Sequence, residues 1–201
     1  MRRFACALMM TLVLLTGCSR GEQTTARAAE ELALSIRAEY LAMTACTAAV
    51  DITADYGQRV YEYSMEIFWS KDGETKLTVT APENIAGITA RIRDGSSCLE
   101  FDGASLETGA LSGTGLSPIE VVPAVLEYIG SGYIGACDFE MNGEEKLLWF
   151  TCRDPNCQPG VGIEASFWFD PMSHALKQAE ILSDGYRVVR CVFRDFSMEH
   201  D

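Results

Sequence analysis

The sequence has little from which a catalytic site or a nucleic-acid interface could be built. Only two of its 201 residues are histidines, and 16 lysines and arginines stand against 29 aspartates and glutamates, which gives a formal net charge of −13 at pH 7. A surface this acidic repels phosphate backbones and anionic headgroups. We therefore predict that the protein binds no nucleic acid and that no basic patch attaches it to a membrane.

Catalytic and metal-binding signatures are scarce as well. The sequence contains no H-E-x-x-H pair, no G-x-x-x-x-G-K phosphate loop and no calcium loop of alternating acids. His200 lies near the C-terminus, and His174 follows the turn Asp170-Pro171, which favours an exposed hairpin residue over a general base. We predict a protein that is not an enzyme and has no cofactor and no metal; an extracytoplasmic hydrolase is the less favoured alternative.

Long apolar runs are also rare, and the one that stands out lies at the N-terminus. Two arginines precede an apolar stretch from Phe4 to Leu15, and Thr16-Gly17-Cys18 closes it. The stretch is about a dozen residues long, short of the roughly 20 that a membrane-spanning helix needs. A basic start, an apolar middle and a small-residue end are typical of a secretory signal.

The junction "LTGC" resembles the signal of bacterial lipoproteins, in which the cysteine of this box is acylated and becomes the mature N-terminus. The resemblance implies that residues 1–17 are a signal peptide and that Cys18 is a lipid anchor on the extracytoplasmic face of the cell membrane. An ordinary cleaved signal that happens to contain a cysteine is the alternative. Removal of residues 1–17 takes away two arginines and no acid, so the net charge becomes −15.

Six cysteines remain after Cys6, in the signal, and Cys18: Cys46, Cys98, Cys137, Cys152, Cys157 and Cys191. An even number in an exported chain suggests disulfides. The pair Cys152 and Cys157 is the simplest candidate, because the turn at Pro155-Asn156 brings its members together. A zinc pair lacks enough further ligands. Six reduced, buried cysteines are the third interpretation.

Two helices are predicted. The segment "TTARAAEELALSIRAEYLAMTAC" lacks glycine and proline and places Leu32, Ile36, Tyr40 and Met43 at helical spacing. It predicts an amphipathic helix over about residues 25–42, after a polar tether at residues 18–24. In "SPIEVVPAVLEYIGSG", Ser117 is the predicted cap, Pro118 opens the second helix and Gly130 ends it.

The remaining chain reads as antiparallel strands joined by tight turns. In "VYEYSMEIFWS" the apolar side chains alternate with polar ones, and in "TKLTVTAP" they do so again. Five turn dipeptides separate such runs: Asp72-Gly73, Asp94-Gly95, Asp102-Gly103, Asn142-Gly143 and Asp184-Gly185. The element order is then helix, about six strands, helix, about five strands.

A sheet of this size must curl to bury its apolar face, and the two helices need that same face. We therefore predict one mainly β (α+β) domain over residues 25–201. Its fold is an unclosed, strongly curved antiparallel half-barrel, with an N-terminal helix and a mid-chain helix covering the apolar concavity.

The leading helix, the run "YSMEIFWSKDGETKLTVTAPENIAGITARIRDGSSCLEFDG" and the proline-started second helix resemble the bacterial lipoprotein-localisation carriers, LolA and LolB, and their anchored relatives in Gram-positive bacteria, including spore-germination lipoproteins. The resemblance covers about residues 25–196. It implies an unclosed barrel whose concavity holds acyl chains. In the soluble carrier an arginine on a strand pins the helical lid, but neither Arg91 nor Arg93 matches the local motif.

The acyl pocket is predicted on one strand face and its hairpin partner, lined by Tyr61, Tyr63, Met65, Ile67, Trp69, Leu77 and Val79. A flexible acyl chain needs apolar area rather than directional bonds. The alternative is that these side chains only pack against the helices as core, and Trp149, Phe167, Trp168 and Phe169 carry the same ambiguity.

The favoured function is therefore a membrane-anchored, non-catalytic lipoprotein that binds a lipid or an acylated protein. The alternative is a regulatory or protein-interaction lipoprotein, for example in spore germination or envelope assembly, with a filled core and a protein partner that the sequence does not name.

Overall fold

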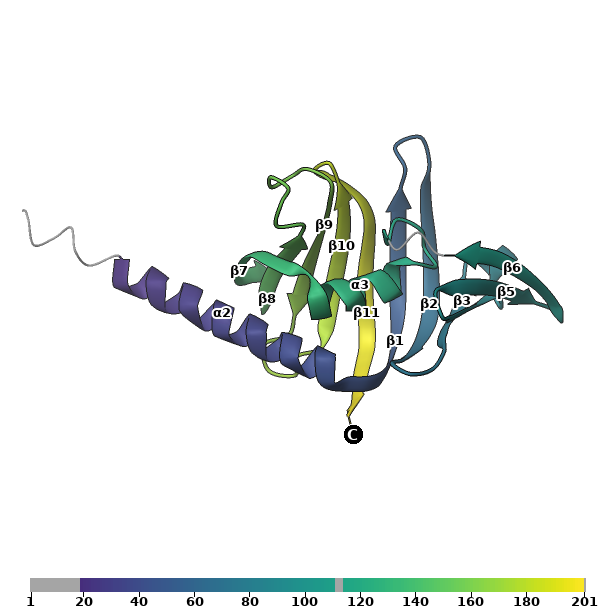
Figure 1. The fold of residues 1–201 in the computed structure, drawn as a ribbon, viewed down its shortest axis with the longest axis horizontal. Coiled ribbons are helices and arrows are strands. Elements are labelled where there is room, and N and C mark those ends of the chain that lie inside the picture. Colours follow the sequence, from purple (N-terminus) through teal and green to yellow (C-terminus); the bar gives the residue numbers. More distant parts are fainter. Residues whose placement is uncertain (1–18, 111–113, 201) are drawn as a thin grey trace, which may run out of the picture.

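The fold is an open antiparallel sheet with two helices on one side (Figure 1), as seen in a computed structural model that describes residues 19–110 and 114–200. The predicted signal peptide and the predicted anchor residue Cys18 lie outside the described residues. Helix α2 spans Ser19–Ala42 and α3 spans Val121–Ser131, and a short 3₁₀ helix, η2, covers Glu83–Ile85. The strands are β1 Met43–Asp55, β2 Val60–Ser70, β3 Thr75–Ala81, β4 Thr89–Arg93, β5 Ser96–Phe101, β6 Ala104–Ala110, β7 Tyr133–Asn142, β8 Glu145–Arg153, β9 Ile163–Phe169, β10 Leu176–Ser183 and β11 Tyr186–His200.

All eleven strands belong to one sheet in the order β6-β5-β4-β3-β2-β1-β11-β10-β9-β8-β7, which does not close into a barrel. Each half of the chain forms a meander, with six strands before α3 and five after it, as predicted. The two meanders join where the first strand pairs with the last, from Met43 opposite His200 to Ala54 opposite Val189. Because the β1–β11 pairing lies in the middle of the sheet, β6 and β7 are its two edge strands.

The turn chemistry of the sequence is confirmed at all five dipeptides, each of which joins two paired strands. Asp94 and Gly95 have φ values of 51° and 73°, and Asp184 and Gly185 have 49° and 78°. Two consecutive residues with positive φ form the type of turn whose twist matches that of the flanking strands. Aspartate tolerates this region better than most residues, and glycine does so without steric cost.

Helix boundaries differ slightly from the prediction. α2 begins at Ser19, so residues 19–24, predicted as part of a polar tether, are helical. No proline interrupts them, and a polar segment has no apolar period from which a helix can be predicted. α3 begins at Val121 because the backbone first makes a turn in which the carbonyl of Ser117 accepts from the amides of Glu120 and Val121, both at 3.0 Å. The hydroxyl of Ser117 therefore does not act as the predicted cap.

The core fills the space between the inner sheet face and the helices. Phe150, Phe167 and Phe169 are fully buried, with ring centroids 5.2–6.4 Å apart. The apolar stripe of α3 belongs to the same buried cluster, and α3 lies across the middle strands in Figure 1. α2 buries a narrow stripe of small and apolar side chains at helical spacing: Ala29, Ala33, Ile36 and Tyr40. The concavity predicted from the sequence is thus largely occupied by side chains.

Candidate functional site

The C-terminal end of α2 is fixed to the sheet by Tyr40. Its ring is only 5% exposed and packs edge-on against Phe169, with centroids 5.4 Å apart. Its hydroxyl donates to the carbonyl oxygen of His174 (3.1 Å) and accepts from the amide of Leu176 (3.0 Å). Burial raises the pKa of the Tyr40 hydroxyl well above its ordinary value, so it stays protonated and remains a donor.

A second contact joins the same two segments. His174 Nδ1 lies 2.8 Å from both carboxylate oxygens of Glu39, and the His174 side chain is 20% exposed. His174 is therefore less exposed than its hairpin position predicted. The imidazole binds a helix carboxylate and faces no second group suited to proton transfer among the contacts described, so this pair serves to position α2.

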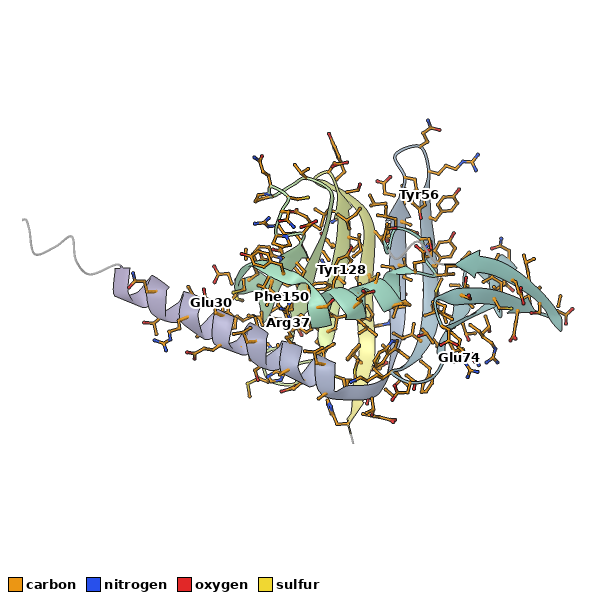
Figure 2. All side chains as sticks on the ribbon, viewed as in Figure 1. Glu30, Arg37, Tyr56, Glu74, Tyr128 and Phe150 are labelled. Atoms are coloured by element: carbon orange, nitrogen blue, oxygen red, sulfur yellow. The ribbon has the colours of Figure 1, made fainter. Side chains whose placement is uncertain are left out.

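Arg37 connects α2 to the end of α3. Its Nε donates to the carbonyl of Ile129 (2.8 Å) and its Nη2 to the carbonyl of Gly132 (2.6 Å). Carbonyls in the last turn of a helix lack intrahelical partners, and a cation there also complements the helix dipole. Figure 2 shows Arg37 between α2 and the end of α3. We call this contact the Arg37 clamp.

The clamp extends to strand β8. Arg37 Nη2 lies 3.5 Å from Cys152 Sγ. Burial raises the pKa of the Cys152 thiol to about 11, and the nearby guanidinium partly offsets this rise. The neighbouring Gly132 leaves no room for a side chain, since an added Cβ would lie 2.6 Å from the carbonyl oxygen of Tyr128 and 2.7 Å from Cys152 Cβ. α2, α3 and β8 therefore meet at one tightly packed point.

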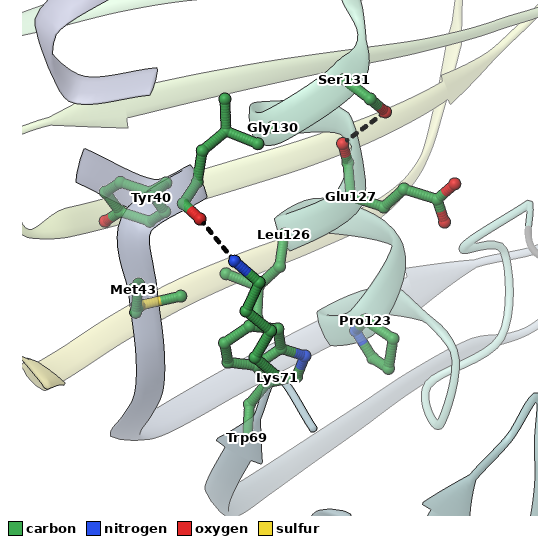
Figure 3. A pocket seen from close by; sticks show the side chains of 10 residues that line it. Tyr40, Met43, Trp69, Lys71, Pro123, Leu126, Glu127, Gly130 and Ser131 are labelled. Atoms are coloured by element: carbon green, nitrogen blue, oxygen red, sulfur yellow. Dashed lines mark hydrogen bonds between the residues drawn. The ribbon is translucent and has the colours of Figure 1, made fainter. Parts of the chain in front are cut away.

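Beside the clamp, an apolar cleft of about 390 Å³ opens between the end of α2, the end of β2 and one side of α3 (Figure 3). It is lined by Tyr40, Leu41, Met43, Trp69, Lys71, Pro123, Leu126, Glu127, Gly130 and Ser131. Leu41 approaches Gly130 closely, because a Cβ on Gly130 would lie 3.2 Å from Leu41 Cδ2. Lys71 Nζ donates to the carbonyl of Leu41 at 2.9 Å, which ties the β2–β3 turn to the end of α2. We call this hollow the helix cleft.

The seven predicted pocket residues share one sheet face, as their alternation indicated, but most of them do not line an open space. Met65 pairs with Val79 and Ile67 with Leu77, and all four are buried in the core with exposed fractions of 1–8%. These four side chains therefore pack as part of the core, which was the alternative interpretation of the sequence, and their role in binding an acyl chain stays a prediction.

The other three predicted residues lie toward the two ends of β2. Tyr61 is 37% exposed and stacks on the partly buried Tyr63, with ring centroids 6.3 Å apart. Trp69 is the one member of the predicted set that lines the helix cleft. The sequence therefore identified one wall of the cleft and missed the helix residues and Arg37. The sequence feature that could have indicated the clamp is the position of Arg37 beside the apolar stripe of α2.

The predicted Cys152–Cys157 bridge is not present in the structure. All six cysteines of the described residues are free thiols. Cys152 points into the core beside Arg37, whereas Cys157 lies in the β8–β9 loop, where its carbonyl accepts from Arg153. Over residues 19–110 and 114–200, no group of three or more His, Cys, Asp or Glu is arranged to hold a metal ion. No helix in these ranges has both the length and the apolar character needed to cross a bilayer.

Comparison with known proteins shows the fold and not the activity. The sequence matches no family model and no curated protein. An uncharacterized conserved protein from Thermus thermophilus aligns with 87% of this chain and 89% of its own, at a TM-score of 0.50 and 9% identity. A putative outer membrane lipoprotein-sorting protein domain from Vibrio parahaemolyticus aligns over 84% and 91% (TM-score 0.46, 10% identity). A LolA superfamily protein from Nitrosomonas europaea aligns over 88% and 94% (TM-score 0.42, 13% identity).

The chain shares its fold with the Thermus thermophilus protein. The open sheet and the two helices over its inner face are the architecture that the sequence analysis predicted, whereas the central pairing of the first and last strands was not predicted. At 9% identity a shared fold carries no substrate or partner with it, so the function has to be argued from the helix cleft.

Proposed function

We propose that this chain is an extracytoplasmic lipoprotein that binds the acyl chain of a lipid or of an acylated protein in the helix cleft, without catalysis. The observation that carries the proposal is the cleft itself. Its volume of about 390 Å³ lies within the range of ~300–1,000 Å³ typical of ligand pockets. Its lining is mostly apolar, and its walls come from two helices and a strand end rather than from one rigid element.

The nature of the lining suits an acyl chain. Met43, Trp69 and Leu126 supply apolar and aromatic surface, and the Met side chain adapts its shape to a flexible guest. Binding would remove apolar surface of the acyl chain and of the cleft from water. This burial is the main favourable contribution to the binding free energy of a ligand segment without polar groups. The site would therefore recognise length and bulk more than chemical detail.

Native mass spectrometry of the untagged protein extracted from its own membrane is the primary test. The expected result is a co-purifying species whose mass corresponds to a lipid or an acylated peptide. A protein that carries no such species, and that takes up no fluorescent fatty acid when titrated with it, would contradict the proposal.

Trp69→Ala is expected to weaken binding of a fluorescent fatty acid by about tenfold or more, because Trp69 is the largest side chain in the cleft lining and a large aromatic in a binding site contributes a large share of the binding energy. Trp168→Ala is the matched control, since Trp168 lies on the outer sheet face, where its Nε1 donates to Glu140 at 2.7 Å. Equal affinities of the two variants would place the acyl chain elsewhere.

Cys18→Ala is expected to move the protein from the membrane fraction to the soluble fraction or to leave an uncleaved precursor, because the acyl chains on Cys18 would provide the apolar burial that holds the protein there. Fractionation and the mass of the mature N-terminus check this. A variant that is cleaved normally and stays membrane-bound would contradict the anchor.

The second candidate is a regulatory or protein-interaction lipoprotein that keeps the fold with a filled interior. The burial of Met65, Ile67, Leu77 and Val79 favours it, because these side chains pack within the core cluster of the described residues. The two candidates differ in the helix cleft: a protein-interaction module needs no acyl chain there, and its affinity for the partner would be unaffected by Trp69→Ala.

A further inference from the structure

We propose that the helix cleft selects single-chain lipids with an anionic head group, and that Lys71 binds that head group at the mouth of the cleft. The inference rests on the proposed function and names its ligand class: a carboxylate or a phosphate on one alkyl chain.

Lys71 is the only cation among the residues that line the helix cleft. Its Nζ makes one hydrogen bond, to the carbonyl of Leu41, and forms no ion pair with any carboxylate of the described residues. An ammonium group has three donors, so two remain for a ligand. Arg91, by contrast, is bound to both Glu74 and Glu100.

The position of Lys71 has a structural reason and leaves its charge available. α2 has no basic residue in its last turn, and Lys71 reaches the end of that helix from the turn after β2, two residues beyond Trp69. In Figure 3 its ammonium reaches the Leu41 carbonyl, and the Lys71 side chain is exposed. A lysine in this arrangement keeps its charge at the surface.

The remaining charge of the cleft does not neutralise Lys71. Glu127 is the one carboxylate of the lining and stands on α3, on the opposite wall, and its carboxylate points away from Lys71 in Figure 3. The net charge of −13 makes the electrostatic potential over the rest of the surface repel anions. A single unpaired cation beside an apolar hollow is therefore the feature that distinguishes an anionic amphiphile from a neutral one.

The volume of the helix cleft limits how many alkyl chains of a lipid it can hold. About 390 Å³ lies near the lower limit of the ~300–1,000 Å³ typical of ligand pockets. This space suits one alkyl chain and is too small for the several chains of a diacyl lipid or a fully acylated lipoprotein held at once. The ligand class is therefore a free fatty acid, an alkyl phosphate or a lipid with one chain.

The test compares dodecanoate, dodecyl phosphate and dodecanol, which share one chain and differ in the head group. Calorimetric titrations use the full chain carrying Cys18→Ala, which lacks the lipid and needs no detergent, alone and combined with Lys71→Gln, Lys71→Arg or Lys76→Gln. Lys76 is the matched control, because it lies on the exposed side of β3 and outside the cleft lining. Thermal unfolding of each variant is measured alongside.

At least one anionic ligand is expected to bind about tenfold more tightly than dodecanol, the effect of one charge-assisted hydrogen bond. Lys71→Gln is expected to remove that preference while leaving dodecanol binding unchanged, and Lys71→Arg is expected to retain it. Lys76→Gln is expected to alter neither.

Three results would overturn the inference, and they separate it from the proposed function. If all three ligands bind equally to the parent chain and to Lys71→Gln, the cleft binds acyl chains without head-group selection, and the proposed function stands. If Lys71→Gln weakens all ligands equally and lowers the melting temperature, Lys71 only caps α2. If no ligand binds the parent chain, the proposed function fails as well.

Discussion

Replacing Ile67 with glutamate is expected to leave the protein largely unfolded at room temperature. Ile67 is 4% exposed and lies opposite Leu77, which is 1% exposed, so the new carboxylate would be buried among apolar side chains. Burial of an unpaired charge costs several kcal/mol, which is comparable to the ~5–15 kcal/mol of net stability of a typical domain. Far-ultraviolet circular dichroism and urea unfolding measure the loss.

Two further substitutions at this site make the result specific. Glu66→Gln, at the adjacent exposed position on the outer face, is expected to change stability by no more than about 0.5 kcal/mol. Ile67→Ala is expected to lower the free energy of unfolding by about 2–5 kcal/mol, as for other large-to-small core substitutions. A small loss for Ile67→Ala together with weakened uptake of a fluorescent fatty acid would contradict the filled core and return Ile67 to the wall of an acyl pocket.

Arg37→Met is expected to lower the free energy of unfolding by about 1.5–3 kcal/mol, the usual contribution of a hydrogen bond to a charged group. Methionine keeps much of the length of the side chain and removes the donors to Ile129 and Gly132. The freed carbonyls at the end of α3 then have to find water, so amide hydrogen exchange should become faster in the last turns of α3 than in the central strands β1 and β11.

The control for the clamp is Arg27→Met on the same helix. Arg27 pairs with Glu31, and the two side chains are 81% and 67% exposed, so the substitution is expected to have little effect on unfolding or on exchange in α3. Equal exchange rates in α3 for both variants would show that Arg37 does not hold this helix.

The clamp also has a consequence for the helix cleft. Arg37 fixes the end of α3 next to Gly130 and about one turn beyond Leu126, and these two residues form one wall of the cleft. Tyr40 fixes the opposite wall through His174 and Leu176. An acyl chain that enters has to displace these walls slightly or use the space already present. Faster uptake of a fluorescent fatty acid by Arg37→Met would indicate that α3 movement limits entry.

The candidate site was only partly predictable because its two sides come from different kinds of pattern. The alternation in β2 placed Trp69 on the inner face, which the structure confirms. The same alternation placed Met65 and Ile67 there too, but whether an inward side chain meets a void or another side chain depends on what covers it. That cover, α3, is separated from β2 by some 50 residues in sequence, and no local pattern records where it docks.

The sequence by itself determined the local structure. Period-2 alternation specified strands, helical spacing specified the buried stripe of α2, and the Asp-Gly and Asn-Gly dipeptides specified the hairpins, because each depends on a few neighbouring residues. Only the tertiary structure decided three long-range features: the pairing of β1 with β11, the filling of the concavity by side chains and the contact of Arg37 with the end of α3. These features join segments about 50 to 160 residues apart, and their energies arise from burial and hydrogen bonds that exist only once the whole chain has folded.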